Sequence, residues 1–165
     1  MGLGKLENKK IGVLGGSFDP AHIGHIKISK IAKKDYNLIQ VIWAITKQNP
    51  FKKNKPNDLY KRTAYAKKIN KRNKFIKVQC FDDIVKSNRT IDLIKYLKKK
   101  FKNTDIFFLM GADNLVNFHK WKGCNSITKM CKILVFDRDG YKSKALKSKS
   151  FKKYNKKTVE FIKFN

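Results

Sequence analysis

The sequence predicts an α/β fold in which a mostly parallel sheet carries helices on both faces. Short apolar runs rich in β-branched residues alternate along the chain with segments of helical spacing, which is typical of βαβ units. A hydrophobic share of 41% and an aromatic share of 12% suffice for a packed core, although the chain is highly charged. A length of 165 residues fits one domain. We therefore expect a single domain over residues 1–165, with a loose N-terminus over residues 1–9.

Each element has its own signal. Apolar or alternating runs predict strands at residues 11–14, 38–45, 75–81, 105–110, 131–136 and 158–164. Helical periodicity or a start signal predicts helices at residues 24–34, 58–70, 90–97, 113–118 and 125–130. Asp58 and Thr90 stand at the N-cap positions of two of these helices. Residues 46–57 and 82–89 are expected to form loops. The Lys- and Ser-rich segment 142–157 is interpreted as a solvated face or a mobile loop rather than a nucleic-acid contact.

The net charge of +28 permits two interpretations. Clustered basic side chains neutralise phosphates, so the charge is compatible with a nucleic-acid binder. However, 36 of the 40 basic residues are Lys and 4 are Arg, whereas nucleic-acid readers rely on bidentate contacts from Arg. Abundant Lys, Asn and Ile beside scarce Gly, Ala, Arg and Pro indicate the bias of an AT-rich genome. We favour this bias over nucleic-acid binding, and we expect the positive field to attract anionic ligands.

The sequence contains no signal for a membrane or for export. No apolar run approaches the length of about 18 residues that a spanning helix needs. The first ten residues lack the apolar stretch of a signal peptide. The three cysteines, Cys80, Cys124 and Cys131, form no CxxC pair, which disfavours a disulfide framework or a zinc ribbon. We expect a cytoplasmic protein without membrane association.

The segment GGSFDPAHIGH, from Gly15 to His25, carries the strongest chemical signal. Gly15 and Gly16 follow the first expected strand and permit a tight turn whose backbone N–H groups can bind phosphate oxygens. His22 and His25 are three residues apart at a helix start, on one side of its positive end. Imidazoles beside N–H donors suit a polyphosphate whose charge grows during reaction. The alternatives are a capping histidine or a zinc pair, but no third ligand stands at a usual zinc spacing.

Unusual residues follow three of the expected strands, in segments 15–25, 46–53 and 111–121. In a parallel sheet the carboxyl ends of the strands meet at one edge, and ligands bind there. We therefore expect these three segments to line one crevice.

GGSFDPAHIGH resembles the signature of the HxGH nucleotidyltransferase superfamily, whose members share a Rossmann-like fold. Further segments resemble, more narrowly, the bacterial nicotinate-nucleotide adenylyltransferases; they are Asn49–Lys52, Thr90–Leu97, Leu109–Leu115, Phe118–Trp121 and Val135–Tyr141. The resemblance implies transfer of AMP from ATP to nicotinate mononucleotide, which forms deamido-NAD and pyrophosphate by in-line attack without a covalent intermediate. It also implies Mg²⁺ bound to the ATP phosphates.

The resemblance also assigns roles to residues. His22 and His25 would be the catalytic pair. ATP and phosphate binding would fall to Gly15, Gly16, Ser17, Phe18 and Lys52, with Lys47 and Arg62 as further phosphate partners. Mononucleotide binding would fall to Thr90, Asp113 and Trp121, and no protein residues are expected to bind a metal. As alternatives, Asp113 could cap a helix and Trp121 could belong to the core, while His119 is expected to pack and hydrogen-bond.

The resemblance breaks near the C-terminal end. Family members carry an I-S-S-T-x-I-R segment that clamps ATP, and this sequence contains none. Two alternatives therefore stand beside an active enzyme. One is a truncated family member that binds nucleotide but turns over weakly or not at all. The other is the basic nucleic-acid-binding module. A neighbouring subunit of an oligomer could also supply the missing clamp.

Overall fold

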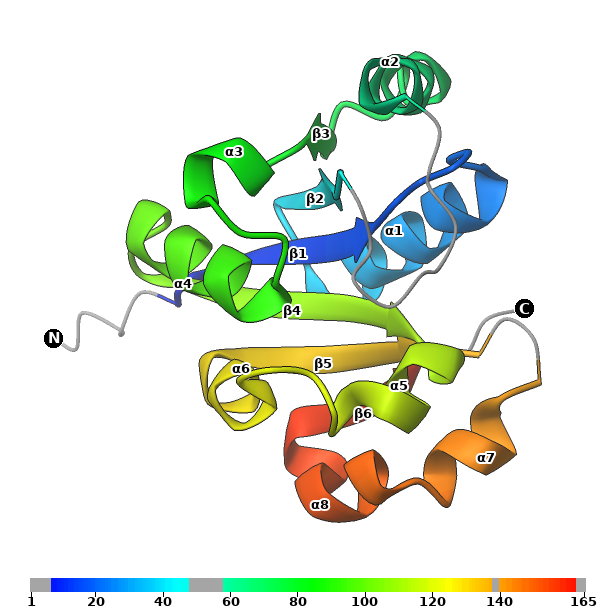
Figure 1. The fold of residues 1–165 in the computed structure, drawn as a ribbon, viewed down its shortest axis with the longest axis vertical. Helices are drawn as coiled ribbons and strands as arrows, with labels where there is room; N and C mark the ends of the chain where they lie inside the picture. The colour runs from blue at the N-terminus through cyan, green and yellow to red at the C-terminus, as the bar shows by residue number, and fades with distance from the viewer. Residues whose placement is uncertain (1–6, 48–57, 138–139, 163–165) are drawn as a thin grey trace, which may run out of the picture.

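The computed structural model describes residues 7–47, 58–137 and 140–162, which contain a six-stranded sheet flanked by helices (Figure 1). The strands are β1 (Lys9–Gly16), β2 (Gln40–Ile45), β3 (Ile76–Gln79), β4 (Thr104–Gly111), β5 (Cys131–Phe136) and β6 (Val159–Ile162). The helices are α1 (Ile23–Tyr36), α2 (Leu59–Ile69), α3 (Asp82–Val85), α4 (Thr90–Lys100), α5 (Ala112–Phe118), α6 (Cys124–Met130), α7 (Lys142–Leu146) and α8 (Lys149–Thr158).

Every pair of neighbouring strands is parallel, and the strand order is β3-β2-β1-β4-β5-β6. This is the order of Rossmann-type sheets, so the expected fold class is confirmed. The chain winds outward from β1 toward β3 and then returns to β4 on the other side of β1. Such sheets bind ligands beyond the carboxyl ends of the strands where the winding reverses, here between β1 and β4.

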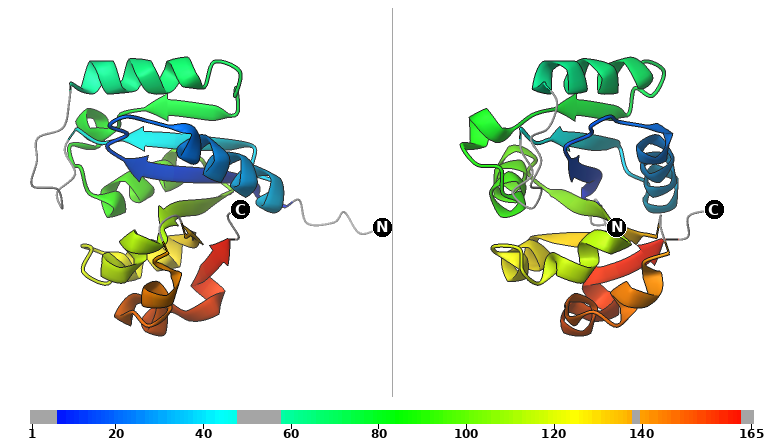
Figure 2. Two further views of the ribbon diagram at one scale, coloured as in Figure 1. Left: turned by 90° about the vertical axis from the view of Figure 1, so that its right-hand side faces the viewer. Right: turned by 45° about the vertical axis from the view of Figure 1, so that its right-hand side comes forward.

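The side chains of the strands alternate between two apolar cores, one on each face of the sheet. Val13, Phe108 and Ile133 belong to the core shared with α4, α5 and α6. Trp43 and Leu109 belong to the core shared with α1 and α2. Both faces are therefore covered by helices, and α2 lies at the opposite end of the molecule from α8 (Figures 1 and 2).

Two segments that were expected to be irregular contain helices. Residues 82–85 form α3, and segment 142–157 falls mostly within α7 and α8, so the expectation of a mobile loop is wrong there. Ala145 and Ser150 are fully buried, while Phe151 and Tyr154 pack against the core. These buried positions are separated by exposed lysines. Because lysines dominate the segment, the sequence shows no clear apolar face.

The first strand starts earlier than expected. Lys9, which we expected in the loose N-terminus, pairs with Thr104 of β4, and the side-chain amide of Asn8 donates to Asp105 at 3.1 Å.

Over the described ranges, none of the helices has the length and apolar character needed to cross a membrane.

Candidate active site

The two histidines of the GGSFDPAHIGH segment cap the N-terminus of α1. His22 is the N-cap residue, and its Nδ1 accepts a hydrogen bond from the N–H of Gly24 at 3.0 Å. His25 reaches back, and its Nδ1 accepts from the N–H of His22 at 3.0 Å. Each bond requires a lone pair on Nδ1, so a neutral imidazole carries its proton on Nε2. The capping role proposed as an alternative is therefore real, and it gives both rings an Nε2–H donor at the positive end of the helix.

The histidine pair packs, through His25, against a stack of aromatic rings that belongs to the core. The His25 ring lies 4.0 Å from the His22 ring and 4.7 Å from the Phe18 ring, measured between centroids. Phe18 is buried and stacks on Trp43 at 5.0 Å. The Trp43 indole in turn donates to Ser29 Oγ at 2.9 Å, and Ser29 Oγ donates to the carbonyl of His25 at 2.8 Å. The imidazoles are thus fixed from both the backbone and the core.

Gly24 leaves the room that this arrangement needs. A Cβ at this position would lie 2.8 Å from Cε1 and 2.9 Å from Nδ1 of His22. Any larger residue would push the imidazole away from the helix end, so the glycine is required by close approach rather than by its backbone angles.

A cavity of about 60 Å³ joins the histidine segment to the end of β4. Its lining residues come from β1, α1, β4, α5 and the segment after α5, and they are Leu14, Gly15, His25, Ile28, Phe108, Leu109, Met110, Gly111, Asn114 and Trp121. The cavity lies at the carboxyl ends of β1 and β4, where the winding reverses. Segments 15–25 and 111–121, two of the three that were expected to share a crevice, both line it, and of the third, 46–53, the structure describes only residues 46 and 47.

The expected mononucleotide residues are only partly brought together. Trp121 lines the cavity and packs edge-on against Phe118 and Phe108, with centroid distances of 5.2 and 6.2 Å. It therefore serves the core and the cavity at once. Asp113 is half-buried in the first turn of α5, whose N-cap is Gly111, and Thr90 is half-buried at the first residue of α4. Neither lines this cavity. The N-cap of α4 is Arg89, so the prediction that Thr90 occupies the cap was wrong by one residue.

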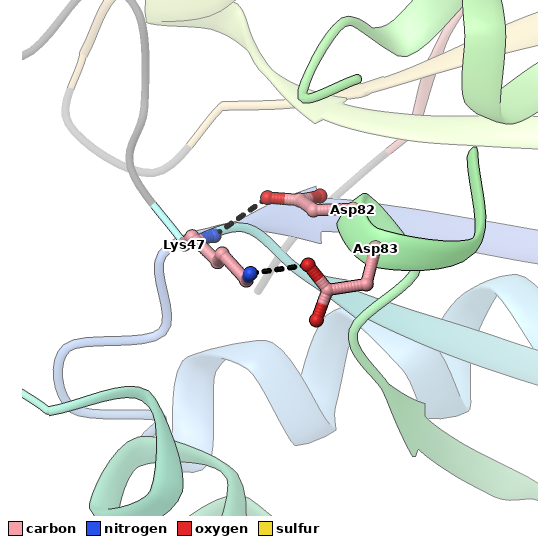
Figure 3. A network of polar contacts seen from close by, with 3 residues as sticks. All are labelled: Lys47, Asp82 and Asp83. Carbon is pink, nitrogen blue, oxygen red and sulfur yellow. Dashed lines mark hydrogen bonds and ion pairs between the residues drawn. The ribbon is translucent and has the colours of Figure 1, made fainter. Parts of the chain in front are cut away.

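The expected phosphate partners have different surroundings. Ser17 and Phe18 are buried in the turn after β1, and Gly15 and Gly16 end the strand. Lys52 lies outside the described residues. The ammonium group of Lys47 pairs with the carboxylate of Asp83, which raises the pKa of Lys47 (Figure 3).

A polar network around the end of β2 was missed by sequence reasoning. The backbone N–H of Lys47 donates to Asp82 Oδ2 at 2.8 Å, and burial raises the pKa of Asp82 despite this bond (Figure 3). Asp58 caps α2, as predicted, by accepting from the N–H of Lys61 at 3.2 Å. Arg62, four residues later, is 4% exposed and donates to backbone carbonyls. No spacing in the sequence reveals the contacts of Arg62, because backbone acceptors belong to every residue type.

Other candidate ligands are engaged elsewhere or dispersed. His119 receives support from Ser150, whose Oγ accepts from the His119 N–H at 2.8 Å and lies 3.1 Å from Nδ1. This packing matches the structural role expected for His119. Across the described ranges, His, Cys, Asp and Glu side chains form no group of three or more that could hold a metal ion. All three cysteines are free thiols.

Comparisons with known proteins identify the family of this chain. Residues 13–162 match the cytidylyltransferase-like family. A probable nicotinate-nucleotide adenylyltransferase of Pelagibacter ubique (strain HTCC1062) is 57% identical over 94% of this chain and 86% of its own length. Another from Ruegeria sp. (strain TM1040) is 32% identical over 90% of this chain and 78% of its own length.

A solved structure shares the fold. The nicotinic acid mononucleotide adenylyltransferase of Plasmodium falciparum complexed with NaAD aligns with a TM-score of 0.71, over 95% of this chain and 77% of that one, at 22% identity. From the family match and the close relatives together, this chain belongs to the cytidylyltransferase-like family and, within it, to the nicotinate-nucleotide adenylyltransferases.

Proposed function

We propose that this protein transfers the adenylyl group of ATP to nicotinate mononucleotide. An oxygen of the mononucleotide 5′-phosphate attacks the α-phosphorus of ATP, the bond from that phosphorus to the β-phosphate oxygen breaks, and pyrophosphate leaves. The product is deamido-NAD, and no covalent enzyme intermediate forms. Chemistry of this kind depends on positioning and on stabilising charge.

The observation that carries the proposal is the pair of imidazoles that cap the N-terminus of α1. With Nδ1 of each ring occupied by a backbone N–H, the Nε2–H groups of His22 and His25 serve as donors to the ATP phosphates. They stabilise the negative charge that accumulates on the leaving pyrophosphate. The N-terminus of α1 and the amides of Gly16, Ser17 and Phe18 add to this stabilisation.

The mononucleotide is assigned to the β4 side of the cavity. Trp121 offers a flat face to the pyridine ring, and it lines the cavity together with His25. Thr90 is proposed to contact the nicotinate carboxylate, and Asp113 is proposed to accept hydrogen bonds from ribose. Lys52 is proposed as a further phosphate ligand.

Mg²⁺ is proposed to enter with ATP as part of the substrate. The described residues offer no cluster of three or more metal-ligating side chains, whereas ATP phosphates supply the oxygen ligands that Mg²⁺ prefers. When bound there, the ion neutralises phosphate charge. We also propose a cytoplasmic location, which free thiols at all three cysteines favour.

The test is a pyrophosphate-release assay on the purified chain with ATP, Mg²⁺ and nicotinate mononucleotide, with the nucleotide product identified by mass. We expect release that depends on the mononucleotide. ATP binding without release would favour the weakly active or inactive family member. If ATP does not bind but RNA or DNA binds with a steep salt dependence, the basic nucleic-acid-binding module is favoured instead.

A further inference from the structure

Arg62 of α2 joins two segments that are distant in sequence. Its guanidinium Nη1 donates to the carbonyls of Ser17 at 2.7 Å and Thr46 at 2.8 Å, and Nη2 donates to the carbonyl of Lys47 at 3.0 Å. The first carbonyl lies in the turn after β1, and the other two follow β2. A planar fork with several fixed donors is the group that can hold such a set of acceptors at once.

The bond to Ser17 fixes the direction of the next amide. The only cis peptide among the described residues joins Asp19 to Pro20, so the Ser17–Phe18 peptide is trans. In a trans peptide the C=O and the N–H point in opposite directions. Because the Ser17 carbonyl faces Arg62, the Phe18 N–H faces away from α2.

Phe18 is held in this orientation from its other side as well. Its φ of 48° lies in the left-handed region, which non-glycine residues adopt only when their surroundings impose it. The ring is buried between Trp43 and His25. The peptide before Phe18 is therefore fixed by Arg62, and the ring after it is fixed against His25.

The segment after β2 is locked into the same unit. The N–H of Thr46 donates to the carbonyl of Gly16 at 2.9 Å, while the N–H of Lys47 donates to Asp82. The ends of β1 and β2 thus share one set of hydrogen bonds, with the Arg62 guanidinium among its members.

We propose that Arg62 is a positioning residue for adenylyl transfer, which aims the Phe18 amide at the phosphates and keeps the Phe18 ring against His25. The inference rests on the proposed function. It replaces the expectation that Arg62 binds phosphate directly, since its donors are engaged by backbone carbonyls in a buried site.

The test compares Arg62→Lys and Arg62→Met with Arg72→Met, which removes the same charge from an exposed position just after α2. All proteins are assayed below the onset of thermal unfolding, so that every molecule counted is folded. We expect kcat to fall about 10- to 100-fold in Arg62→Met, since misaiming one donor forfeits part of the effect of deleting it, while KM for ATP changes far less. The kcat of Arg62→Lys should lie between those of wild type and Arg62→Met. The kcat of Arg72→Met should stay within about twofold of wild type.

A second measurement reports on the amide itself. Addition of inorganic pyrophosphate should shift the Phe18 amide resonance in ¹⁵N-labelled wild type, and this shift should be lost in Arg62→Lys. If Arg62→Lys folds and both its kcat and its amide shift equal those of wild type, the inference is overturned. This result is decisive even if Arg62→Met does not fold. Absence of turnover in wild type, with the shift present and sensitive to Arg62, contradicts the proposed function instead.

Discussion

The two sides of the cavity are built in different ways. On the histidine side, local backbone contacts determine the geometry, because His22 and His25 bond to N–H groups of their own helix end. On the β4 side, Gly111 caps α5 without a side chain, and Trp121 is held by ring contacts with Phe108 and Phe118. The histidines are therefore oriented chiefly by hydrogen bonds within their own segment, with the Phe18 ring packed behind them, whereas the Trp121 ring packs against aromatic side chains.

This difference fits the work that each side is proposed to do. Charge that develops on phosphate is stabilised best by donors that are already in place, since they cost no reorganisation during the reaction. A flat pyridine ring needs a surface of matching shape, which packed aromatic rings provide. Substitutions on the histidine side should therefore reduce kcat, while those on the β4 side should raise KM for the mononucleotide.

The largest effect is expected for His25→Ala. Loss of the Nε2–H donor should lower kcat about 100- to 1000-fold. Loss of the bond to the His22 N–H should lower the free energy of unfolding by about 1 kcal/mol. Steady-state kinetics and thermal denaturation measure the two effects. Lys30→Ala, an exposed change on the same helix, is the control, and a kcat for His25→Ala near that of Lys30→Ala would contradict the assignment.

Gly24→Ala separates position from stability. The added methyl should displace the exposed His22 ring at a cost of about 1 kcal/mol for the lost cap, which the helix propensity of Ala offsets by a similar amount. The melting temperature should hardly change, whereas kcat should fall about tenfold or more because one phosphate donor moves. Retention of full activity would show that His22 need not stay where Gly24 allows it.

Trp121→Ala tests the β4 side. It should raise KM for nicotinate mononucleotide about 2- to 12-fold, in line with the roughly 0.5–1.5 kcal/mol of an aromatic contact, and leave KM for ATP nearly unchanged. Trp121→Phe, which keeps a ring against Phe118, should raise this KM by a smaller factor. Equal increases for both substrates would mean that the ring only supports the core.

The smallest effect concerns the far edge of the sheet and depends on pH. Hydrogen bonds from Lys132 and Tyr36 hold the pKa of Glu160 below its ordinary value of 4.5. The ionised form is thus favoured in the folded state, so its contribution is present above pH 4.5 and is lost as the pH falls through the lower folded pKa.

Because the pair of Glu160 and Lys132 is partly exposed, with side chains 42% and 36% accessible, Glu160→Gln should cost less than about 1 kcal/mol at neutral pH. The difference from wild type should shrink progressively as the pH is lowered below 4.5, as followed by chemical denaturation at each pH. A difference that grows on acidification would contradict the assigned direction of the pKa shift.

The sequence predicts most of the sheet because each strand is a local apolar run bounded by turn residues. The short helix α3 was not predicted, because its four residues span little more than one helical turn and show no periodic pattern. Segment 142–157 was misread as irregular because its buried residues include serines, and Ser150 finds its partner in His119, 31 positions away. Contacts of that range leave no local pattern.

The site divides in the same way. His22, His25, Gly15 and Gly16 are predicted site residues from a local motif, and the capping bonds of the two histidines are local as well. Arg62 was expected at a phosphate but holds carbonyls, and the carboxylates that face Lys47 were not anticipated. Their partners belong to other elements, so only the folded chain brings them together.

In the proposed reaction, the His25 imidazole acts on phosphate in addition to capping α1. His25→Gln tests it most directly, because a glutamine at this position of a capping box can still accept from the His22 N–H but lacks the imidazole donor. We predict a melting temperature close to wild type together with a loss of kcat about as large as that of His25→Ala. Wild-type turnover in a normally stable His25→Gln would contradict the claim and leave His25 with the cap alone.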